Sequence, residues 1–274
     1  MANQGDHGRF SWNELMTSNT DAAKKFYSEV VGWTTKDWGD GAMDYTLFSN
    51  GDIPVAGLMK IPPEAAAMGA PPSWSAYVEV SDVDATIEQA TKLGASMLGP
   101  AQSVQGVGRF AMMRDPQGIA FAIVTSENPL SPEGDPQAFE FSWHELSTTD
   151  AAAAFAFYNA LFGWEKTGEF DMGPMGVYQM YGRGRFIYGG MMNATPGAPH
   201  HWLHYARVPD SADAAAERAG KAGGTVILPP MDVPGGDRVA VVIDPQGAGF
   251  GIHFKAAVPA TPAMDSASRP ATLP

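Results

Sequence analysis

The sequence predicts an α+β fold of two tandem domains, each built from two βαβββ units that form a curved mixed sheet around a cup. Three observations support this prediction. The chain repeats itself, each copy contains two capped amphipathic helices, and short apolar strands follow each helix. Single helices that alternate with short strands favour an α+β sheet over a parallel doubly wound one.

The repeat is visible in two segments that lie 131 residues apart. Residues 10–33 (FSWNELMTSNTDAAKKFYSEVVGW) and 141–164 (FSWHELSTTDAAAAFAFYNALFGW) are identical at 12 of 24 positions. The match resumes between GRFAMMRDPQG (108–118) and DRVAVVIDPQG (237–247), at an offset of 129. Because the offset changes so little, any insertion between the copies has the size of a loop. A duplicated domain of about 125 residues is therefore predicted.

The first domain is predicted over 1–127 and the second over 139–256. The segment 128–138 lies in a stretch rich in Pro, Ser, Asp and Glu, which is typical of a linker. Residues 257–274 are low in large apolar side chains and rich in Pro and Ala, which indicates a disordered tail. We expect the two domains to pack together as a monomeric pseudo-dimer, with a homodimer as the alternative.

The elements of the first copy follow from helix caps, helix stops and apolar runs. The residues SNTD supply N-cap candidates for the first helix, and Gly32 and Gly94 end the two helices. A DPQG turn, with Pro at its second position, joins the last two strands. The predicted elements are a strand 9–16, a helix 22–31, strands 45–49, 55–61 and 73–80, a helix 81–93, and strands 108–114 and 119–125.

Composition argues against several classes of partner and site. The net charge is −13 and the Lys and Arg residues are scattered, which disfavours nucleic acid and anionic membranes. The absence of cysteine removes disulfides, thiolate nucleophiles and Cys-ligated metal sites. No apolar run approaches the roughly 20 residues that span a bilayer, and MANQGDHGRF lacks the apolar region of a signal peptide. We therefore expect a cytoplasmic protein whose partner is a small molecule.

The repeated motifs resemble those of the vicinal oxygen chelate superfamily, which includes glyoxalases, bleomycin-resistance proteins and extradiol dioxygenases. The resemblance rests on FY…GW at the end of a helix together with the DPQG turn before the last strand. It covers residues 10–125 and 139–255. The resemblance implies the fold predicted above. It also implies a divalent metal in the catalytic members, held by a His on strand one, a His or Gln on strand five and a Glu on strand eight.

The chain departs from that metal-ligand pattern in both copies. The positions that the resemblance assigns to the ligands hold Trp143, Leu203 and Gly251 in the second copy and Trp12, Ser75 and Ala122 in the first. None of these residues is a good metal ligand. We therefore expect no cofactor, with a divalent metal as the open alternative.

Period-two alternation along the strands predicts which side chains face the cups. On the last strand of the second copy, Phe250, Ile252 and Phe254 are large and apolar, so they belong under the helices and His253 faces the cup. The polar and aromatic residues predicted to face the cups are Trp12, Glu14, Tyr77 and Glu79 in the first copy, and Trp143, Glu145, Tyr205, Arg207 and His253 in the second.

Glu145, His253 and Glu14 are the predicted catalytic residues. A carboxyl group in an apolar, Trp-lined cup has its pKa raised, which suits a general acid or base near neutral pH. An ion pair with a neighbouring Arg is the alternative for the two glutamates. Arg207 suits the binding of a carboxylate or carbonyl oxygen of a ligand, whereas the two tryptophans also suit simple packing in the cup wall. The predicted ligand-binding residues are Trp12, Trp143, Tyr77, Glu79, Tyr205 and Arg207.

His144 stands in the second copy where the first copy has Asn13. Alternation places both side chains on the face that packs against the helices, which favours a hydrogen-bonded structural histidine. A metal ligand in one copy only, with His204, His200 or His201 as its partners, is the alternative.

Three functions are compatible with these observations. The first is a metal-independent lyase or isomerase that acts on a small, partly apolar carbonyl compound. The second is a non-catalytic protein that sequesters a drug or toxin in an aromatic pocket. The third is a divalent-metal-dependent lyase or extradiol dioxygenase, which the missing metal ligands disfavour.

Overall fold

The computed structural model describes residues 6–38, 44–128 and 134–256. In the first repeat the elements are β1 (Phe10–Thr17), α1 (Thr20–Val30), β2 (Thr34–Asp37), β3 (Tyr45–Asn50), β4 (Ile53–Lys60), α2 (Pro63–Ala67), β5 (Ser73–Glu79), α3 (Val83–Lys92), β6 (Ser96–Met97), β7 (Gln102–Val104), β8 (Gly108–Arg114) and β9 (Ala120–Ser126). In the second they are β10 (Phe141–Thr148), α4 (Ala151–Phe162), β11 (Glu165–Asp171), the short helix η1 (Gly173–Met175), β12 (Val177–Arg183), β13 (Phe186–Asn193), β14 (His201–Arg207), α5 (Ala212–Lys221), β15 (Thr225–Asp232), β16 (Arg238–Ile243) and β17 (Gly249–Phe254).

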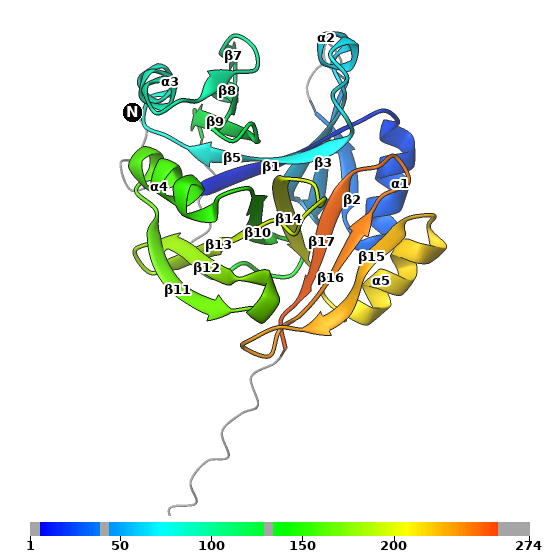
Figure 1. The fold of residues 1–274 in the computed structure, drawn as a ribbon. Helices are drawn as coiled ribbons and strands as arrows, with labels where there is room; N and C mark the ends of the chain where they lie inside the picture. The colour runs from blue at the N-terminus through cyan, green and yellow to red at the C-terminus, as the bar shows by residue number, and fades with distance from the viewer. Residues whose placement is uncertain (1–5, 39–43, 129–133, 257–274) are drawn as a thin grey trace, which may run out of the picture.

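Each repeat forms one curved mixed sheet (Figure 1). The first sheet has the order β2-β3-β4-β1-β5-β9-β8-β6, with β7 paired to β8, and the second has the order β11-β12-β13-β10-β14-β17-β16-β15. The first strands of the two βαβββ units lie side by side and antiparallel at the centre of each sheet. The predicted α+β fold of two tandem units is confirmed.

The helices begin and end where their caps predict. The side chains of Asn19 and Asp82 accept the backbone N–H groups of Ala22 and Ala85 at 3.1 and 3.0 Å. These bonds satisfy N–H groups that the first turn of a helix leaves without partners. Gly32 follows the first helix with a φ of 96°, a conformation that glycine adopts without steric cost.

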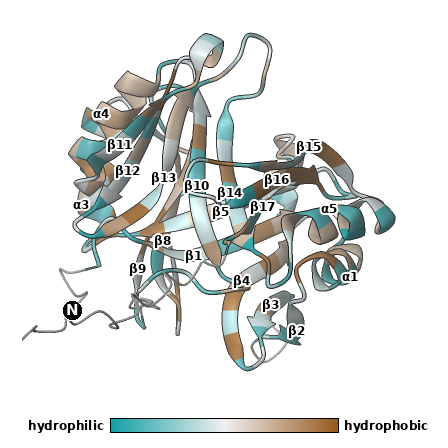
Figure 2. Cartoon of the chain, turned by 90° about the horizontal axis from the view of Figure 1, so that it is seen from below, coloured by the Kyte–Doolittle hydropathy of each residue, from teal (hydrophilic) through white to brown (hydrophobic). Residues whose placement is uncertain are grey.

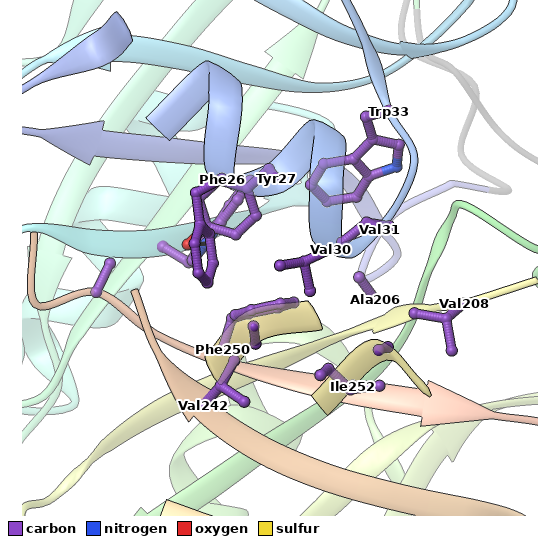
Figure 3. Packing of buried hydrophobic residues seen from close by; sticks show 14 of the residues in the cluster. Phe26, Tyr27, Val30, Val31, Trp33, Ala206, Val208, Val242, Phe250 and Ile252 are labelled. Carbon is purple, nitrogen blue, oxygen red and sulfur yellow. Dashed lines mark hydrogen bonds between the residues drawn. The ribbon is translucent and has the colours of Figure 1, made fainter. Parts of the chain in front are cut away.

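Two hydrophobic cores hold the repeats together, and each core combines residues from both. In the first core, Phe26, Tyr27 and Val30 of α1 point toward Phe250 and Ile252 of β17 (Figure 3). The second core combines α4 with the sheet face that carries α3 in the first repeat. Seen from below, the α1–α5 pair and the α3–α4 pair lie on opposite sides of the central strands (Figure 2). The helix faces of the two sheets therefore pack against each other, and the concave faces point away.

The limits of the predicted domains remain predictions. Residues 129–133 of the predicted linker and the whole of the predicted tail 257–274 lie outside the described residues. None of the helices in the described part of the chain is long and apolar enough to cross a membrane. The oligomeric state and the cytoplasmic location also remain predictions.

Candidate functional site

In the first repeat, the carboxyl group of Glu14 accepts two hydrogen bonds within a chain of four side chains. The Tyr45 hydroxyl donates to Oε2 at 2.8 Å, and the Tyr77 hydroxyl donates to Oε1 at 2.9 Å. The Trp12 indole N–H in turn donates to the Tyr45 hydroxyl at 3.1 Å. Each carboxyl oxygen therefore accepts one tyrosine O–H, and the two donors come from strands on either side of β1.

The second repeat contains the same chain. The Tyr178 hydroxyl donates to Oε2 of Glu145 at 2.9 Å, and the Tyr205 hydroxyl donates to Oε1 at 3.3 Å. The Trp143 indole N–H donates to the Tyr178 hydroxyl at 2.7 Å. A Trp–Tyr–Glu–Tyr arrangement is thus common to both cups.

A glycine opposite each glutamate makes room for the tyrosine. Gly57 of β4 pairs with Glu14, and Gly190 of β13 pairs with Glu145. A Cβ atom on Gly57 would lie 1.8 Å from the Tyr45 hydroxyl oxygen, and one on Gly190 would lie 2.1 Å from the ring of Tyr178. Both distances are far below van der Waals contact, so any larger residue at these positions displaces the tyrosine.

Burial raises the pKa of the carboxyl groups of Glu14 and Glu145, and the hydrogen bonds from the tyrosines only partly oppose this. Burial and the nearby negative charge of Glu14 raise the pKa of Tyr45 and Tyr77 above its usual value. The tyrosines therefore stay protonated as donors. The carboxyl groups are the members of the chain that exchange a proton closer to neutral pH.

Glu14 opens onto a cavity of about 440 Å³. This size falls within the usual range for small-molecule sites, roughly 300–1,000 Å³. Most of the wall is apolar or aromatic, and it includes Trp12, Met16, Trp38, Leu47, Met59, Tyr77, Val107, Phe110, Met112 and Val124. The polar wall groups include Ser11, Gln102, Ser126 and Asn128. A ligand in this cavity meets a largely apolar surface whose one carboxyl group, among the described residues, belongs to Glu14.

Three of the four residues predicted for the first cup line this cavity, namely Trp12, Glu14 and Tyr77. Glu79 is placed differently. Its carboxylate accepts the backbone N–H of Ser126 at 2.8 Å and the Ser126 hydroxyl at 2.7 Å, and its side chain is buried. The structure thus gives Glu79 a partner at the end of β9 instead of a place in the cavity wall.

In the second cup, Trp143, Glu145 and Tyr205 come together as described. His253 has two partners, since its Nδ1 lies 2.7 Å from the Ser142 hydroxyl oxygen and its Nε2 lies 3.0 Å from Oδ2 of Asp237. Arg207, adjacent to His253 in the β14–β17 ladder, donates to the carbonyl oxygen of Pro136.

The sequence reasoning missed Tyr45 and Tyr178. Both supply a hydroxyl to a cup glutamate from the third strand of their unit, where no motif marks them. A signal was present in the repeat, because the two tyrosines lie 133 residues apart and so do Gly57 and Gly190. The shared offset shows that both residues are repeated, although only the structure shows that they touch.

His144 and His204 lie on the helix-packed face, as alternation predicts. Their Nδ1 atoms are 2.9 Å apart, and the ring of His144 stacks on Phe10 with the ring centroids 3.7 Å apart. Burial lowers the pKa of both rings, to about 3 for His204, so the pair is neutral at pH 7. One Nδ1 donates and the other accepts. This is the structural histidine that the alternation favours.

The side chains of the cups do not match the family's metal-ligand pattern. Within 6–38, 44–128 and 134–256, no three His, Cys, Asp or Glu side chains gather where they could hold one metal ion. At the position that the family gives to a Glu ligand, a Cβ on Gly251 would lie 2.1 Å from the ring of Tyr205. The tyrosine that binds Glu145 thus occupies the space that a ligand side chain would need.

Comparisons with known proteins agree with this fold. A family model described as "Glyoxalase/Bleomycin resistance protein/Dioxygenase superfamily" matches residues 9–123 and 141–252. The chain is 34% identical to "Putative glyoxylase CFP32" of Mycobacterium tuberculosis over 249 residues, which cover 89% of this chain and 94% of that protein. It is 32% identical to "Anthracycline biosynthesis protein DauV" of Streptomyces sp. (strain C5) over 276 residues, covering 95% and 98%.

Solved structures show the same fold at low sequence identity. The 2,3-dioxygenase LapB from Pseudomonas sp. KL28 matches with a TM-score of 0.64 and 12% identity, over 92% of this chain and 94% of that chain. The Mn(II)-bound glyoxalase from Novosphingobium aromaticivorans matches with a TM-score of 0.60 and 14% identity, over 91% and 82%. The chain belongs to the glyoxalase/bleomycin resistance protein/dioxygenase superfamily, as its FY…GW and DPQG motifs predict.

Proposed function

We propose that the cavity of the first repeat binds a small, largely apolar carbonyl compound and that Glu14 moves a proton at the carbon next to the carbonyl. This is the chemistry of a metal-independent isomerase or lyase. The observation that carries the proposal is a buried carboxyl group, held by two tyrosine hydroxyls, in the wall of an apolar cavity. A second cup with the same four residues gives Glu145 the corresponding role.

The electrostatics of Glu14 suit proton transfer. Burial raises the pKa of its carboxyl group, which brings the proton affinity closer to that of a general base at neutral pH. Tyr45 and Tyr77 orient the carboxylate, because each holds one of its oxygens. The remaining lone pairs of these oxygens can accept a proton from the ligand.

Ser11 supports a place for the carbonyl oxygen. It lines the cavity next to Trp12, and among the described residues its buried hydroxyl oxygen has no hydrogen-bond partner. A buried hydroxyl normally has a partner. A ligand carbonyl oxygen would accept the Ser11 proton and would be stabilised as it gains negative charge.

The names of two relatives support the ligand class. DauV and DnrV are both named as anthracycline biosynthesis proteins. Anthracyclines are fused-ring aromatic compounds that carry carbonyl groups, and the aromatic and Met-rich wall suits such rings. A bicyclic aryl ketone is therefore a suitable first probe.

The experiment uses 1-tetralone, an aryl ketone with exchangeable hydrogens next to its carbonyl, and NMR to follow their exchange with deuterium in D₂O. We expect the protein to accelerate exchange, and we expect Glu14→Gln in a Glu145→Gln background, where the second cup does not contribute, to lower the rate about 100-fold or more. Glu88→Gln, on the exposed face of α3, is the matched control. Glu145→Gln then shows how much exchange occurs in the second cup.

Binding is followed separately through the fluorescence of Trp12 and Trp38, which both line the cavity. If 1-tetralone binds but exchanges only at the background rate, the proton-transfer proposal is wrong and the sequestering function takes its place. If adding Glu14→Gln to Glu145→Gln leaves the exchange rate unchanged, Glu14 is not the base.

A further inference from the structure

Strand β10 contains a bulge at Ser142. The pairing with β14 shifts register between Phe141 and Trp143, and β1 has the same shift between Phe10 and Trp12. In the first repeat the bulged residue, Ser11, lines the cavity. The bulge is therefore the local feature that turns a serine hydroxyl toward the cup.

In the second repeat, the side chains of His253 and Asp237 form a hydrogen-bonded series with the hydroxyl of Ser142. Nδ1 of His253 lies 2.7 Å from Oγ of Ser142, and Nε2 lies 3.0 Å from Oδ2 of Asp237. Because Asp237 accepts the Nε2 proton, Nδ1 is left with a lone pair that accepts the serine O–H. The side chains of His253 and Asp237 are 12% and 28% exposed, so the pair is partly accessible to solvent.

The fold does not require this arrangement. In the first repeat, Val124 of β9 stands at the position that corresponds to His253. Gly108 of β8 stands at the position that corresponds to Asp237. Ser11 is retained, and its hydroxyl oxygen is without a hydrogen-bond partner in the described part of the chain. The same bulge thus exists with and without the histidine and the aspartate, which argues against a purely structural role for them.

We propose that Ser142, His253 and Asp237 form a nucleophilic site that hydrolyses activated esters through an acyl-serine. Ser142 Oγ attacks the ester carbonyl carbon while its proton passes to Nδ1 of His253. The C–O bond to the alcohol breaks, and the leaving oxygen takes that proton from Nδ1. Water then attacks the acyl-serine with the same base, which releases the acid and restores the serine. The sum is ester plus water giving acid plus alcohol.

The surroundings favour the neutral imidazole that this cycle needs. Burial lowers the pKa of His253, and Asp237 opposes that effect through its hydrogen bond and charge. Arg207, beside His253 in the β14–β17 ladder, and Lys255 contribute positive charge. Asp237 is a positioning residue, since it fixes the ring and its tautomer.

A fluorophosphonate probe and p-nitrophenyl acetate test the site on the full chain. We expect the probe to label Ser142, located by mass spectrometry of the peptides, and the protein to release p-nitrophenol. Ser142→Ala should abolish the label and lower the release at least tenfold. Asp237→Asn should lower the release at least tenfold with the serine still present, because the tautomer is no longer fixed. Ser147→Ala, on the same strand, is the matched control and should change neither.

Labelling of the unchanged protein needs no variant, so a folding defect cannot hide the result. The proposal is overturned if Ser142 stays unlabelled, or if p-nitrophenol release survives Ser142→Ala. It is also overturned if both Asp237→Asn and His253→Gln release p-nitrophenol at the rate of the unchanged protein. The site is independent of the proposed function of the first cavity, because Ser142→Ala leaves Glu14 and its tyrosines in place, and 1-tetralone exchange in a Glu145→Gln background reports on those alone.

Discussion

The hydroxyl of Tyr27 in α1 donates a hydrogen bond of 3.0 Å to Oδ2 of Asp244, in the DPQG turn of the other repeat. Tyr158 makes the same bond, also 3.0 Å long, to Asp115. The second oxygen of each aspartate accepts backbone N–H groups of its own turn. The FY motif of one repeat and the DPQG motif of the other therefore hold the two sheets together. This explains why both motifs occur in both copies.

Removing the Tyr27 hydroxyl should destabilise the association of the repeats. Tyr27→Phe leaves a buried carboxylate oxygen of Asp244 without its donor. The indole N–H of Trp74 also loses its acceptor, the Tyr27 hydroxyl oxygen, which lies 2.9 Å away in the unchanged protein. An unsatisfied buried polar group costs about 1–3 kcal/mol, so the free energy of unfolding should fall by at least that much. Urea denaturation measures it. Tyr188→Phe is the control, and an equal loss in both variants would contradict the assigned bond.

Gly57 should be intolerant of even one methyl group. Gly57→Ala places a Cβ 1.8 Å from the Tyr45 hydroxyl oxygen, so the ring must move and the bond to Glu14 must break. Overpacking of this kind costs about 1–3 kcal/mol. Gly99→Ala, where no atom lies within 4 Å of the new Cβ, should cost much less.

A double-mutant cycle shows whether Tyr45 is the cause. In a Tyr45→Ala background, Gly57→Ala should lose most of its effect on the free energy of unfolding, because the clashing ring is gone. If the two substitutions are additive, the glycine is needed for a different reason. Trp12, whose Nε1 lies 3.1 Å from the same Cβ position, is the next neighbour to examine.

The buried histidine pair should make the protein sensitive to acid. Burial lowers the pKa of His144 and His204 below the ordinary 6.5, so the unfolded chain takes up protons that the folded one does not. The stabilisation is complete above pH 6.5. It is lost as the pH falls from 6.5 toward the folded pKa, which is about 3 for His204.

Replacing the pair by its counterparts in the first repeat tests this. His144→Asn with His204→Ala copies Asn13 and Ala76, which pair in the same register. The difference in the free energy of unfolding between the unchanged and double-substituted proteins should shrink or reverse as the pH drops from 7 to 5. His200→Asn, an exposed histidine, should leave the pH profile unchanged. Parallel profiles for the unchanged and double-substituted proteins would show that the pair does not titrate on unfolding.

Most of the fold and the faces of the strands were predictable because they depend on local period and on the repeat. The apolar alternation of Phe250 and Ile252 correctly placed them under the helices. The partners of Glu14 were only half predictable. Tyr77 lies on the neighbouring strand in the predicted set, whereas Tyr45 reaches Glu14 across β4 through the space above Gly57.

Contacts between distant strands were not predictable from alternation. Glu79 was expected to face the cup, but the end of the parallel β5–β9 pairing brings Ser126 to its carboxylate. Ser142 was not singled out, because a strand without a bulge would point it to the opposite side from Trp143. The bulge is a property of the β10–β14 pairing, which the linear sequence does not mark.

Glu14 should give the protein a pH dependence of the opposite sign to the histidine pair. Burial raises the folded pKa of its carboxyl group above the ordinary 4.5, so the folded chain holds a proton that the unfolded one releases. The stabilisation is present below pH 4.5 and is lost as the pH rises through the folded pKa. Glu14→Gln removes this titration, so the free energy of unfolding of the variant should fall less steeply than that of the unchanged protein as the pH rises from 4.5 toward 7.

Urea denaturation at a series of pH values measures the slopes, with Glu88→Gln as the exposed control. Because the amide also disturbs the bonds to Tyr45 and Tyr77 at every pH, only the slope is diagnostic. An unchanged slope would mean that Glu14 keeps an ordinary pKa, and its assignment as a general base near neutral pH would lose its electrostatic support.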